Sequence, residues 1–293
     1  MLPPRQRSTA MTIPGRDVRA AFRLVGPAVR LPGGEGRSVR VGDVVLKPTG
    51  PDPEFAEWLG DIMASVVADG FRVARPLRAT TGSWSHDGWT ASHVVAGAEP
   101  DHAAAPRWGE IIAAGRAFHR ALAHVPRPGF LDRRRDWWAT GDRVAWQEQD
   151  ADPLPAVRAP YTALTSLFGP KPQASPQLVH GDLTGNVLVA PGLAPAVIDF
   201  SPYWRPPAFG EAVVVADALI WHGAGPGLLH EVVSANGPDV VPYVARALVF
   251  RLVTTNERLR ARPTEQSRAT IAEIRRYADA ARLLADIASR PGG

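Results

Sequence analysis

The stretch His180-Gly181-Asp182-Leu183-Thr184-Gly185-Asn186 decides the fold of this chain, together with Val197-Ile198-Asp199-Phe200 shortly after it. Both segments place polar side chains at turns that follow or interrupt short apolar runs typical of strands. We therefore expect Asp182, Asn186 and Asp199 at strand ends, where they converge on one edge of a cleft. Two carboxylates and an amide oxygen form a ligand set that suits Mg²⁺ when bound phosphates fill the remaining positions.

This pattern resembles the signature of the aminoglycoside phosphotransferase family, a group of kinase-like enzymes that phosphorylate small molecules. Their signature is H-G-D, an Asn four residues after the Asp, and an I-D pair on the next hairpin. The resemblance implies that Asp182 is the catalytic base and that Asn186 and Asp199 are the Mg²⁺ ligands. It also implies that His180 is a structural member of the loop and that Asp217 anchors this loop without taking part in the chemistry.

The fold implied by this resemblance is a bilobal, protein-kinase-like α+β fold. A small β-rich N-lobe is expected over residues 16–97 and a larger helical C-lobe over 98–293, after a tail of residues 1–15. The apolar residues between Val39 and Leu46 flank a Gly42-Asp43 pair, which predicts two short strands joined by a tight turn. The pattern also predicts strands at 71–77 and 88–96.

Helices are expected on both sides of the signature. Asp52-Pro53-Glu54 provides an N-cap, a first-turn proline and an acidic first turn, which predicts a helix through about Asp69. Apolar residues at three- and four-residue spacings predict a helix over 107–125. The Pro- and Ala-rich stretch 151–177 fits either an insertion or a ragged helix. Two further helices are predicted at about 239–260 and 264–289.

A nucleotide clamp is expected in the N-lobe. Val44-Val45-Leu46-Lys47 resembles the kinase strand whose lysine holds the α- and β-phosphates. Only Lys47 and Lys171 are lysines in a chain that otherwise uses arginine, which favours a specific role for Lys47. Gly33 and Gly34 lie in a glycine-rich turn that can approach phosphates closely.

Two further contacts are expected in this lobe. In this fold the adenine edge is read by backbone between the lobes, which here falls near Val95. The carboxylate partner of Lys47 is either Glu54 or Glu57, with a slight preference for Glu54, which flanks the apolar stripe of its helix.

Composition excludes several classes of protein. Hydrophobic residues make up 45% of the 293 residues, as in an ordinary globular protein. No cysteine is present, so disulfides, thiolate metal sites and cysteine nucleophiles are excluded. A net charge of +4, from 33 basic and 29 acidic residues, is too weak for a nucleic-acid partner. No apolar run is long enough for a membrane span, so we expect no membrane partner and a cytoplasmic location.

Other features are less decisive. Tyr203-Trp204-Arg205 either lines an acceptor pocket or packs its segment onto the helical lobe, and the Pro-rich run around it resembles an actinobacterial subgroup of the family. His119 and His124 are five residues apart, which does not fit paired zinc ligands on a helix. Arg133-Arg134-Arg135 is interpreted as a solvated helix face and not as a nucleic-acid patch.

These observations predict a small-molecule kinase that moves the γ-phosphoryl group of ATP or GTP to a hydroxyl group, with Mg²⁺ as cofactor. The alternative is a catalytically silent nucleotide-binding or scaffold module of the same fold. All four of Lys47, Asp182, Asn186 and Asp199 are present, which favours the enzyme.

No H-R-D loop or A-P-E segment supports a protein kinase. The last 55 residues mix acids with ten arginines and form no acidic funnel for a polycationic aminoglycoside. The sequence leaves the acceptor, the choice between ATP and GTP, and the oligomeric state open.

Overall fold

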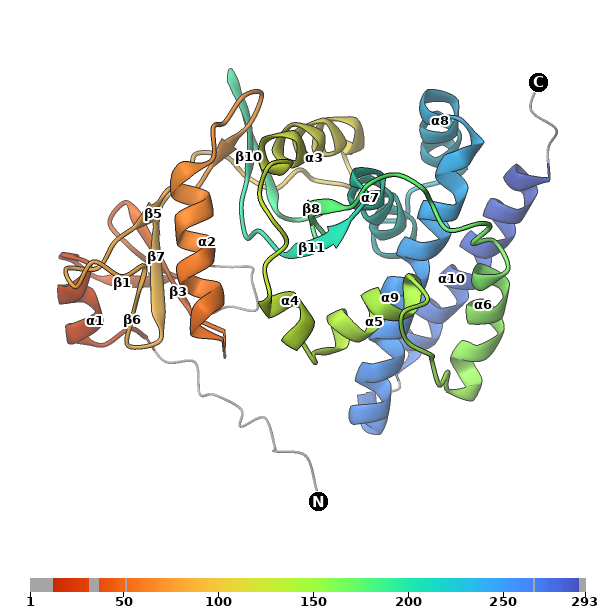
Figure 1. Cartoon of the computed structure of the whole chain (residues 1–293), viewed down its shortest axis with the longest axis horizontal. Helices are drawn as coiled ribbons and strands as arrows, with labels where there is room; N and C mark the ends of the chain where they lie inside the picture. Colours follow the sequence, from red (N-terminus) through yellow and green to blue (C-terminus); the bar gives the residue numbers. More distant parts are fainter. Residues whose placement is uncertain (1–12, 32–36, 51, 266, 290–293) are drawn as a thin grey trace. The chain divides into compact units, whose positions relative to one another are not determined.

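The computed structural model of the chain describes residues 13–31, 37–50, 52–265 and 267–289 (Figure 1). The chain divides into two compact units. One comprises Met1–Ala68 and Arg72–Ala96, and the other comprises Asp69–Phe71 and Gly97–Gly293. None of the helices in the described part of the chain combines the length and the apolar character that a membrane span requires. Gly33, Gly34 and most of the expected tail lie outside the described residues.

The first unit is built on an antiparallel sheet with strand order β1-β2-β3-β7-β5, in which β6 also pairs with β7. The strands of this sheet are β1 (Ala28–Arg30), β2 (Val39–Val41), β3 (Val44–Pro48), β5 (Pro76–Leu77), β6 (Ser85–His86) and β7 (Trp89–His93). Strand β4 (Arg72–Val73) also belongs to this unit but not to this sheet. Its helices are α1 (Arg16–Ala21) and α2 (Pro53–Ser65).

The predicted hairpin around Gly42 is confirmed. Strands β2 and β3 pair with Val39 opposite Leu46, and Gly42 adopts a φ of +61°, a conformation that glycine reaches without a steric penalty. Alternate residues, including Val44 and Leu46, are buried in the core of this unit. Because successive side chains of a strand point to opposite faces, Lys47 is directed to the face opposite Leu46.

Helix α2 begins as predicted but ends four residues early. The Asp52 side chain accepts a hydrogen bond from the Glu54 N–H at 3.0 Å and caps the first turn. The helix ends at Ser65, not at Asp69, because Val66 leaves the helical region with a ψ of 127°. The Ser65 hydroxyl also donates to the Asp61 carbonyl in the last turn.

Two other predictions for this unit need correction. The strand expected at 71–77 is interrupted, and its two parts, β4 and β5, are separated by Ala74 and Arg75. The strand expected at 88–96 ends at His93. Helix α1, which the sequence pattern did not indicate, places Val18 and Ala21 in the core of the sheet.

The second unit is mainly helical. Its helices are α3 (Trp108–Leu122), α4 (Phe130–Arg133), α5 (Trp137–Ala145), α6 (Pro155–Thr165), α7 (Pro207–Trp221), α8 (Pro226–Asn236), α9 (Val241–Ala261) and α10 (Arg268–Ala288), with short 3₁₀ turns η2 (Pro238–Val240) and η3 (Pro263–Glu265). Its strands are β8 (Gln177–His180), β9 (Val187–Ala190), β10 (Leu193–Val197) and β11 (Pro202–Arg205). Strand β8 pairs with β11 and β9 pairs with β10, both antiparallel.

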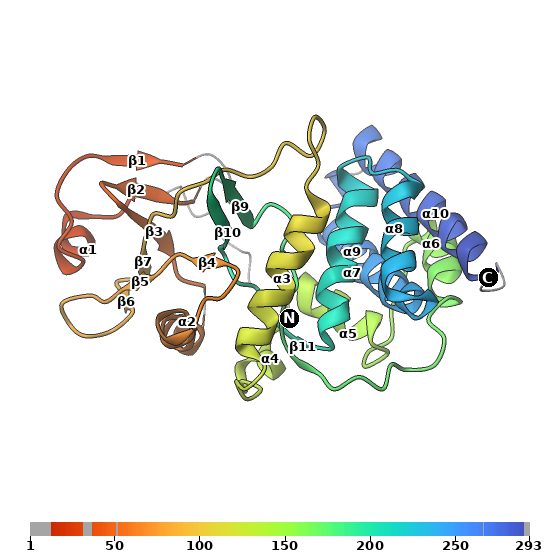
Figure 2. The same cartoon turned by 90° about the horizontal axis from the view of Figure 1, so that it is seen from above.

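The core of this unit lies among helices α7, α9 and α10, which pack side by side (Figure 2). Helix α7 is apolar around most of its circumference, as expected of a helix buried on all sides. The helices predicted at 107–125, 239–260 and 264–289 correspond to α3, α9 and α10 with small differences at their ends. The ambiguous stretch 151–177 contains α6, which accommodates Pro160 within it.

The prediction of a solvated helix face at Arg133-Arg134-Arg135 is wrong for Arg134. Helix α4 ends at Arg133, and the next two arginines lie in the turn before α5. Only 23% of the Arg134 side chain is exposed, and its guanidinium bonds to Asp136 and to the Tyr203 hydroxyl. Periodicity cannot distinguish such a turn from a helix in a run of like charges.

Candidate active site

The loop between β8 and β9 carries the motif that the sequence analysis singled out. Strand β8 ends at His180, opposite Pro202 of β11, and the Gly181 N–H continues the pairing by donating to the Ser201 carbonyl at 3.0 Å. The chain then turns so that the Asn186 N–H donates to the Leu183 carbonyl at 2.9 Å. This turn leads into β9 and places Asp182 and Asn186 on the same loop.

The β9–β10 hairpin returns the chain to this loop. Val187 pairs with Val197, and the Ile198 N–H donates to the Asn186 carbonyl at 2.9 Å. Asp199 follows immediately, so the register of the hairpin brings it next to Asn186. Asp199 adopts a φ of +51°, a left-handed conformation that is uncommon outside glycine and that Asp and Asn tolerate best.

His180 connects the two ends of this arrangement. One ring nitrogen, Nδ1, accepts from the Asp182 N–H at 3.1 Å, and Nε2 donates to the Ile198 carbonyl at 3.1 Å. Both contacts are satisfied only by the neutral ring. Burial lowers the pKa of His180, which keeps that form, although both Asp182 and Asp199 lie close enough to oppose the shift. His180 therefore fixes the backbone beside both aspartates.

Helix α3 contributes His119, whose ring contacts the backbone of His180. The His180 N–H donates to Nε2 of His119 at 2.9 Å, and burial lowers the pKa of His119 to about 3. Gly210 of α7 leaves room for this ring, because a Cβ there would meet the His119 Cε1 at 2.5 Å. His119 is thus a neutral hydrogen-bond acceptor in the core, and its relation to the signature loop was not evident from the sequence.

Asp182 is held by two side chains and remains half-exposed. Its Oδ1 accepts from Arg251 of α9 at 2.8 Å, and its Oδ2 accepts from the Asn186 amide at 3.1 Å. About 46% of the Asp182 side chain is exposed, whereas Arg251 is 1% exposed. The carboxylate is therefore fixed in direction from within the protein and open on its outer side.

Arg251 also binds Asp217, which is fully buried in α7. Two hydrogen bonds of 2.7 Å join the Arg251 guanidinium to the two oxygens of Asp217. Although burial opposes the charged form, the attraction of Asp217 and Asp182 raises the pKa of Arg251. The chain Asp217–Arg251–Asp182 links helices α7 and α9 to the loop, which is the anchoring role expected of Asp217.

Sequence reasoning missed Arg251, although a signal for it exists. Arg251 lies in the run Ala247-Leu248-Val249-Phe250-Arg251-Leu252-Val253, and Asp217 lies in a similar apolar run. A charge embedded in an apolar helix is rarely buried without an opposite charge. Pairing the two embedded charges would have indicated the contact.

The hydrogen bonds of Asn186 are compatible with the oxygen set proposed for Mg²⁺. The Asn186 amide nitrogen donates to the Asp182 carbonyl at 2.7 Å and to its carboxylate, which leaves the amide oxygen for a cation. Within the described residues, no three His, Cys, Asp or Glu side chains form a metal cluster by themselves. A set of one amide and one or two carboxylates matches the way Mg²⁺ is bound together with substrate phosphates.

The first unit contains the remaining candidates. Lys47 lies on β3 opposite Thr90 of β7. Val95 follows β7, and both of its neighbours in the chain are hydrogen-bonded. The Val94 N–H donates to the Asp43 carbonyl, and the Ala96 carbonyl accepts from Arg72. The roles of Lys47 and Val95 in nucleotide binding remain predictions.

The Glu57 carboxylate already accepts hydrogen bonds within the first unit. It accepts from the backbone N–H groups of Trp84 and Ser85 at 3.0 Å and from the Ser85 hydroxyl at 2.8 Å. This leaves Glu54 as the better candidate for pairing with Lys47.

The comparisons with known proteins agree with this arrangement. The sequence model of the Phosphotransferase enzyme family matches residues 29–239. No curated protein sequence matches the chain. Among solved structures, an aminoglycoside phosphotransferase from Alicyclobacillus acidocaldarius is 14% identical with a TM-score of 0.62, covering 97% of this chain and 96% of that one.

Two other solved structures are similar in fold. A spectinomycin phosphotransferase in complex with ADP and spectinomycin is 13% identical with a TM-score of 0.55, covering 92% of this chain and 96% of that one. A choline/ethanolamine kinase family protein from Mesorhizobium loti is 18% identical with a TM-score of 0.58, covering 94% and 99%. The predicted α+β, kinase-like fold is confirmed by these neighbours. Because the family model spans most of the chain and includes the loop that carries Asp182, the chain belongs to the phosphotransferase enzyme family.

Proposed function

We propose that the chain is a small-molecule kinase that transfers the γ-phosphoryl group of ATP or GTP to a hydroxyl group of its acceptor. The observation that carries this proposal is that the Asp182 carboxylate is held in one direction and is still accessible. This carboxylate is oriented by Arg251 and Asn186 and is still 46% exposed. A carboxylate that is fixed yet accessible is what the orientation of an attacking hydroxyl requires.

In the proposed reaction Asp182 accepts a hydrogen bond from the acceptor hydroxyl. The hydroxyl oxygen forms a bond to the γ-phosphorus, the bond from that phosphorus to the β–γ bridging oxygen breaks, and the nucleoside diphosphate leaves. The proton of the hydroxyl passes to Asp182. Asn186 and Asp199 would hold Mg²⁺, which when bound neutralises charge on the transferred phosphates.

The role proposed for Lys47 is to hold the α- and β-phosphates of the nucleotide. The strand register directs its side chain away from the core residues Val44 and Leu46. Glu54 is proposed as its carboxylate partner, because Glu57 is committed to Trp84 and Ser85. We propose a cytoplasmic location for this activity, because nucleoside triphosphates are available there.

A thermal-shift titration of the purified chain with ATP and GTP, each with and without Mg²⁺, tests the proposal. A ligand that binds only the folded state stabilises it by about 2.7 kcal/mol at a concentration 100-fold above Kd. For a protein of this size that corresponds to a rise of several degrees in Tm. The shift is expected with Mg²⁺ and one or both nucleotides.

The variant Asp199→Asn should lose the Mg²⁺-dependent part of this shift. Asp286→Asn is the matched control, since it removes one exposed carboxylate from α10 and should respond as the wild type does. Absence of a shift with either nucleotide at millimolar concentration would contradict the kinase and favour a scaffold that binds no nucleotide. A full shift in Asp199→Asn would remove that residue from the metal site.

A further inference from the structure

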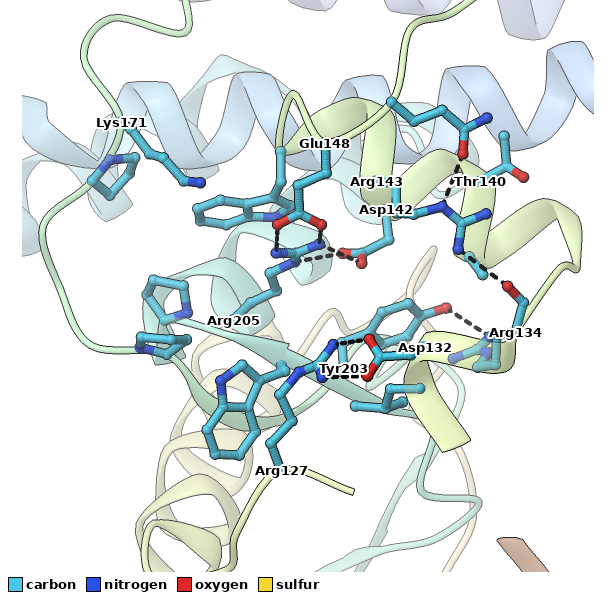
Figure 3. Close-up of a pocket in the computed structure, with 18 of the residues that line it drawn as sticks. Arg127, Asp132, Arg134, Thr140, Asp142, Arg143, Glu148, Lys171, Tyr203 and Arg205 are labelled. Atoms are coloured by element: carbon cyan, nitrogen blue, oxygen red, sulfur yellow. Dashed lines mark hydrogen bonds and ion pairs between the residues drawn. The ribbon is translucent and has the colours of Figure 1, made fainter. Parts of the chain in front are cut away.

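A large pocket lies within the second unit, outside the residues assigned to phosphoryl transfer. Its volume is about 710 Å³, within the usual range for small-molecule sites. Its walls come from the α4–α5 segment, the stretch before β8 and strand β11 (Figure 3). The aromatic side chains Trp146, Tyr203 and Trp204 contribute apolar surface to it.

Positive charge predominates in this pocket. Six of the residues that line it are cationic: Arg127, Arg134, Arg135, Arg143, Lys171 and Arg205. Only three are acidic, namely Asp132, Asp142 and Glu148. The excess of cations contrasts with the overall balance of the chain, which is close to neutral for its length.

The acidic residues are used to hold particular arginines in place. Arg205 donates to both oxygens of Glu148 and to both oxygens of Asp142, at 2.6 to 2.9 Å (Figure 3). Arg127 makes a two-bond contact with Asp132. Tyr203, Trp204 and Arg205 line this pocket, and Arg205 also joins β11 to α5 through Asp142.

Arg134 pairs with the Asp136 carboxylate, whereas Arg135 and Arg143 have no carboxylate among their hydrogen-bond partners in the described part of the chain. Arg135 donates to the backbone carbonyls of Asp132 and Arg134, and Arg143 donates to the Gln149 side chain and the Arg134 carbonyl. Carbonyl and amide oxygens satisfy hydrogen-bond donors but do not neutralise their charge. These two arginines thus bring to the pocket positive charge that no directly hydrogen-bonded carboxylate neutralises.

Lys171 is a further cation of the pocket that has no hydrogen-bonded carboxylate in the described part of the chain. It is directed toward Glu148 and Arg205 in Figure 3 and lies close enough to help lower the pKa of Glu148. It is also one of only two lysines in the chain, and the proposed nucleotide site uses the other, Lys47. A lysine offers a compact charge with three rotatable donors, which suits a phosphate or carboxylate that arrives from solution.

We propose that this pocket binds a small organic anion carrying a carboxylate or phosphate group, held by Arg135, Arg143 and Lys171. The site is distinct from the phosphoryl-transfer site, because neither Asp182 nor Asn186 lines the pocket. Tyr203 forms the boundary between the two.

The position of Tyr203 explains this separation. Its ring lies against Gly181, where a Cβ would approach the ring to 2.3 Å, and its hydroxyl accepts from Arg134. The ring is 4% exposed and packs on Phe250 at a centroid distance of 5.4 Å. An anion in the pocket would thus be separated from the Asp182 loop by one aromatic side chain.

Calorimetric titration of the full chain, without nucleotide, tests the proposal. The probes are citrate and glucose 6-phosphate, with glucose as the uncharged control. Binding is expected for the two anions and not for glucose, and it should weaken as NaCl is raised, because salt screens exposed charges. Failure of both anions to bind at millimolar concentration would overturn the proposal.

Substitution of the exposed cations locates the bound anion. The double variant Arg135→Gln/Lys171→Gln should raise the dissociation constant about tenfold or more, the order expected for loss of charge-assisted hydrogen bonds. The double variant Arg268→Gln/Arg275→Gln on α10 removes the same charge from exposed positions and should bind as the wild type does. Equal affinity in the first variant and the wild type would contradict the assignment.

A final comparison separates this pocket from the nucleotide site, which could also attract anions. Anion binding should persist in Lys47→Gln and in the presence of saturating Mg·ATP. Loss of binding under either condition would assign the anion to the nucleotide site instead. Because the titration needs no phosphoryl transfer, its outcome is independent of whether the chain is an active kinase.

Discussion

Arg251 is 1% exposed and donates a hydrogen bond of 2.8 Å to the half-exposed carboxylate of Asp182. The same guanidinium is held from its other side by Asp217, which is buried and comes from a neighbouring helix. A buried charge is tolerated only when it is paired. Arg251 therefore serves both the stability of the helical core and the direction of the Asp182 carboxylate.

Replacing Arg251 with Met should leave Asp217 as an unpaired buried carboxylate. We expect the free energy of unfolding to fall by about 3–5 kcal/mol, which chemical denaturation can measure. The double variant Arg251→Met/Asp217→Leu removes both buried charges and should recover much of this loss. If the second substitution gives no recovery, the destabilisation does not come from the buried charge of Asp217.

The role of Asp182 predicts a separation between binding and turnover. Asp182→Asn keeps the size of the side chain and an oxygen that can accept from Arg251, so the fold and the nucleotide affinity should be unchanged. Phosphoryl transfer should fall by about two to four orders of magnitude, the usual scale for a general base. The measurement is the rate of nucleoside diphosphate release, either during transfer to an acceptor or during hydrolysis of the nucleotide by water. Unchanged turnover would remove Asp182 from the mechanism.

The sequence predicted the members of the site that belong to one local motif. Asp182, Asn186 and Asp199 lie within 18 residues, and the β9–β10 hairpin together with the β8–β11 pairing is enough to bring their backbones together. Helices such as α3 and α10 were predicted because their apolar residues repeat with the helical period. In both cases the information is local in the chain.

The contacts that the sequence did not predict depend on packing between distant segments. Arg251 is 69 residues from Asp182, and His119 is 61 residues from His180. Glu57 is engaged by Trp84 and Ser85, which local helix geometry cannot reveal. The charged residues of the pocket likewise come from elements whose pairing is set by the tertiary fold.

Gly181 is expected to be sensitive to substitution because of the Tyr203 ring. A Cβ at this position would lie 2.3 Å from Tyr203 Cδ2, and the ring is itself enclosed. Gly181→Ala should therefore cost about 1–3 kcal/mol in stability through overpacking. Gly109→Ala is the control, since a Cβ there meets nothing within 4 Å and alanine favours the helix. Equal stability of the two variants, compared by denaturant unfolding, would show that the Tyr203 ring moves away without cost.

The neutral His119 predicts a specific dependence of stability on pH. Burial lowers the pKa of His119 to about 3 in the folded chain, from 6.5 when exposed. Between these values the unfolded state binds the additional proton, so stability falls as pH decreases from about 6.5 toward 3 and is fully present above 6.5. At pH 5 the loss from this residue is about 2 kcal/mol, since each pKa unit corresponds to about 1.4 kcal/mol.

The variant His119→Gln isolates this contribution, because a Gln oxygen can still accept from the His180 N–H but does not titrate. Urea unfolding at pH 7.5 and pH 5.0 should show that the wild type loses about 2 kcal/mol more than this variant over that interval. The carboxylates are common to both proteins and cancel in the comparison. His124→Gln, on an exposed histidine just beyond the same helix, should follow the wild type. If His119→Gln and the wild type lose the same stability, His119 is not held neutral by its burial beside the signature loop.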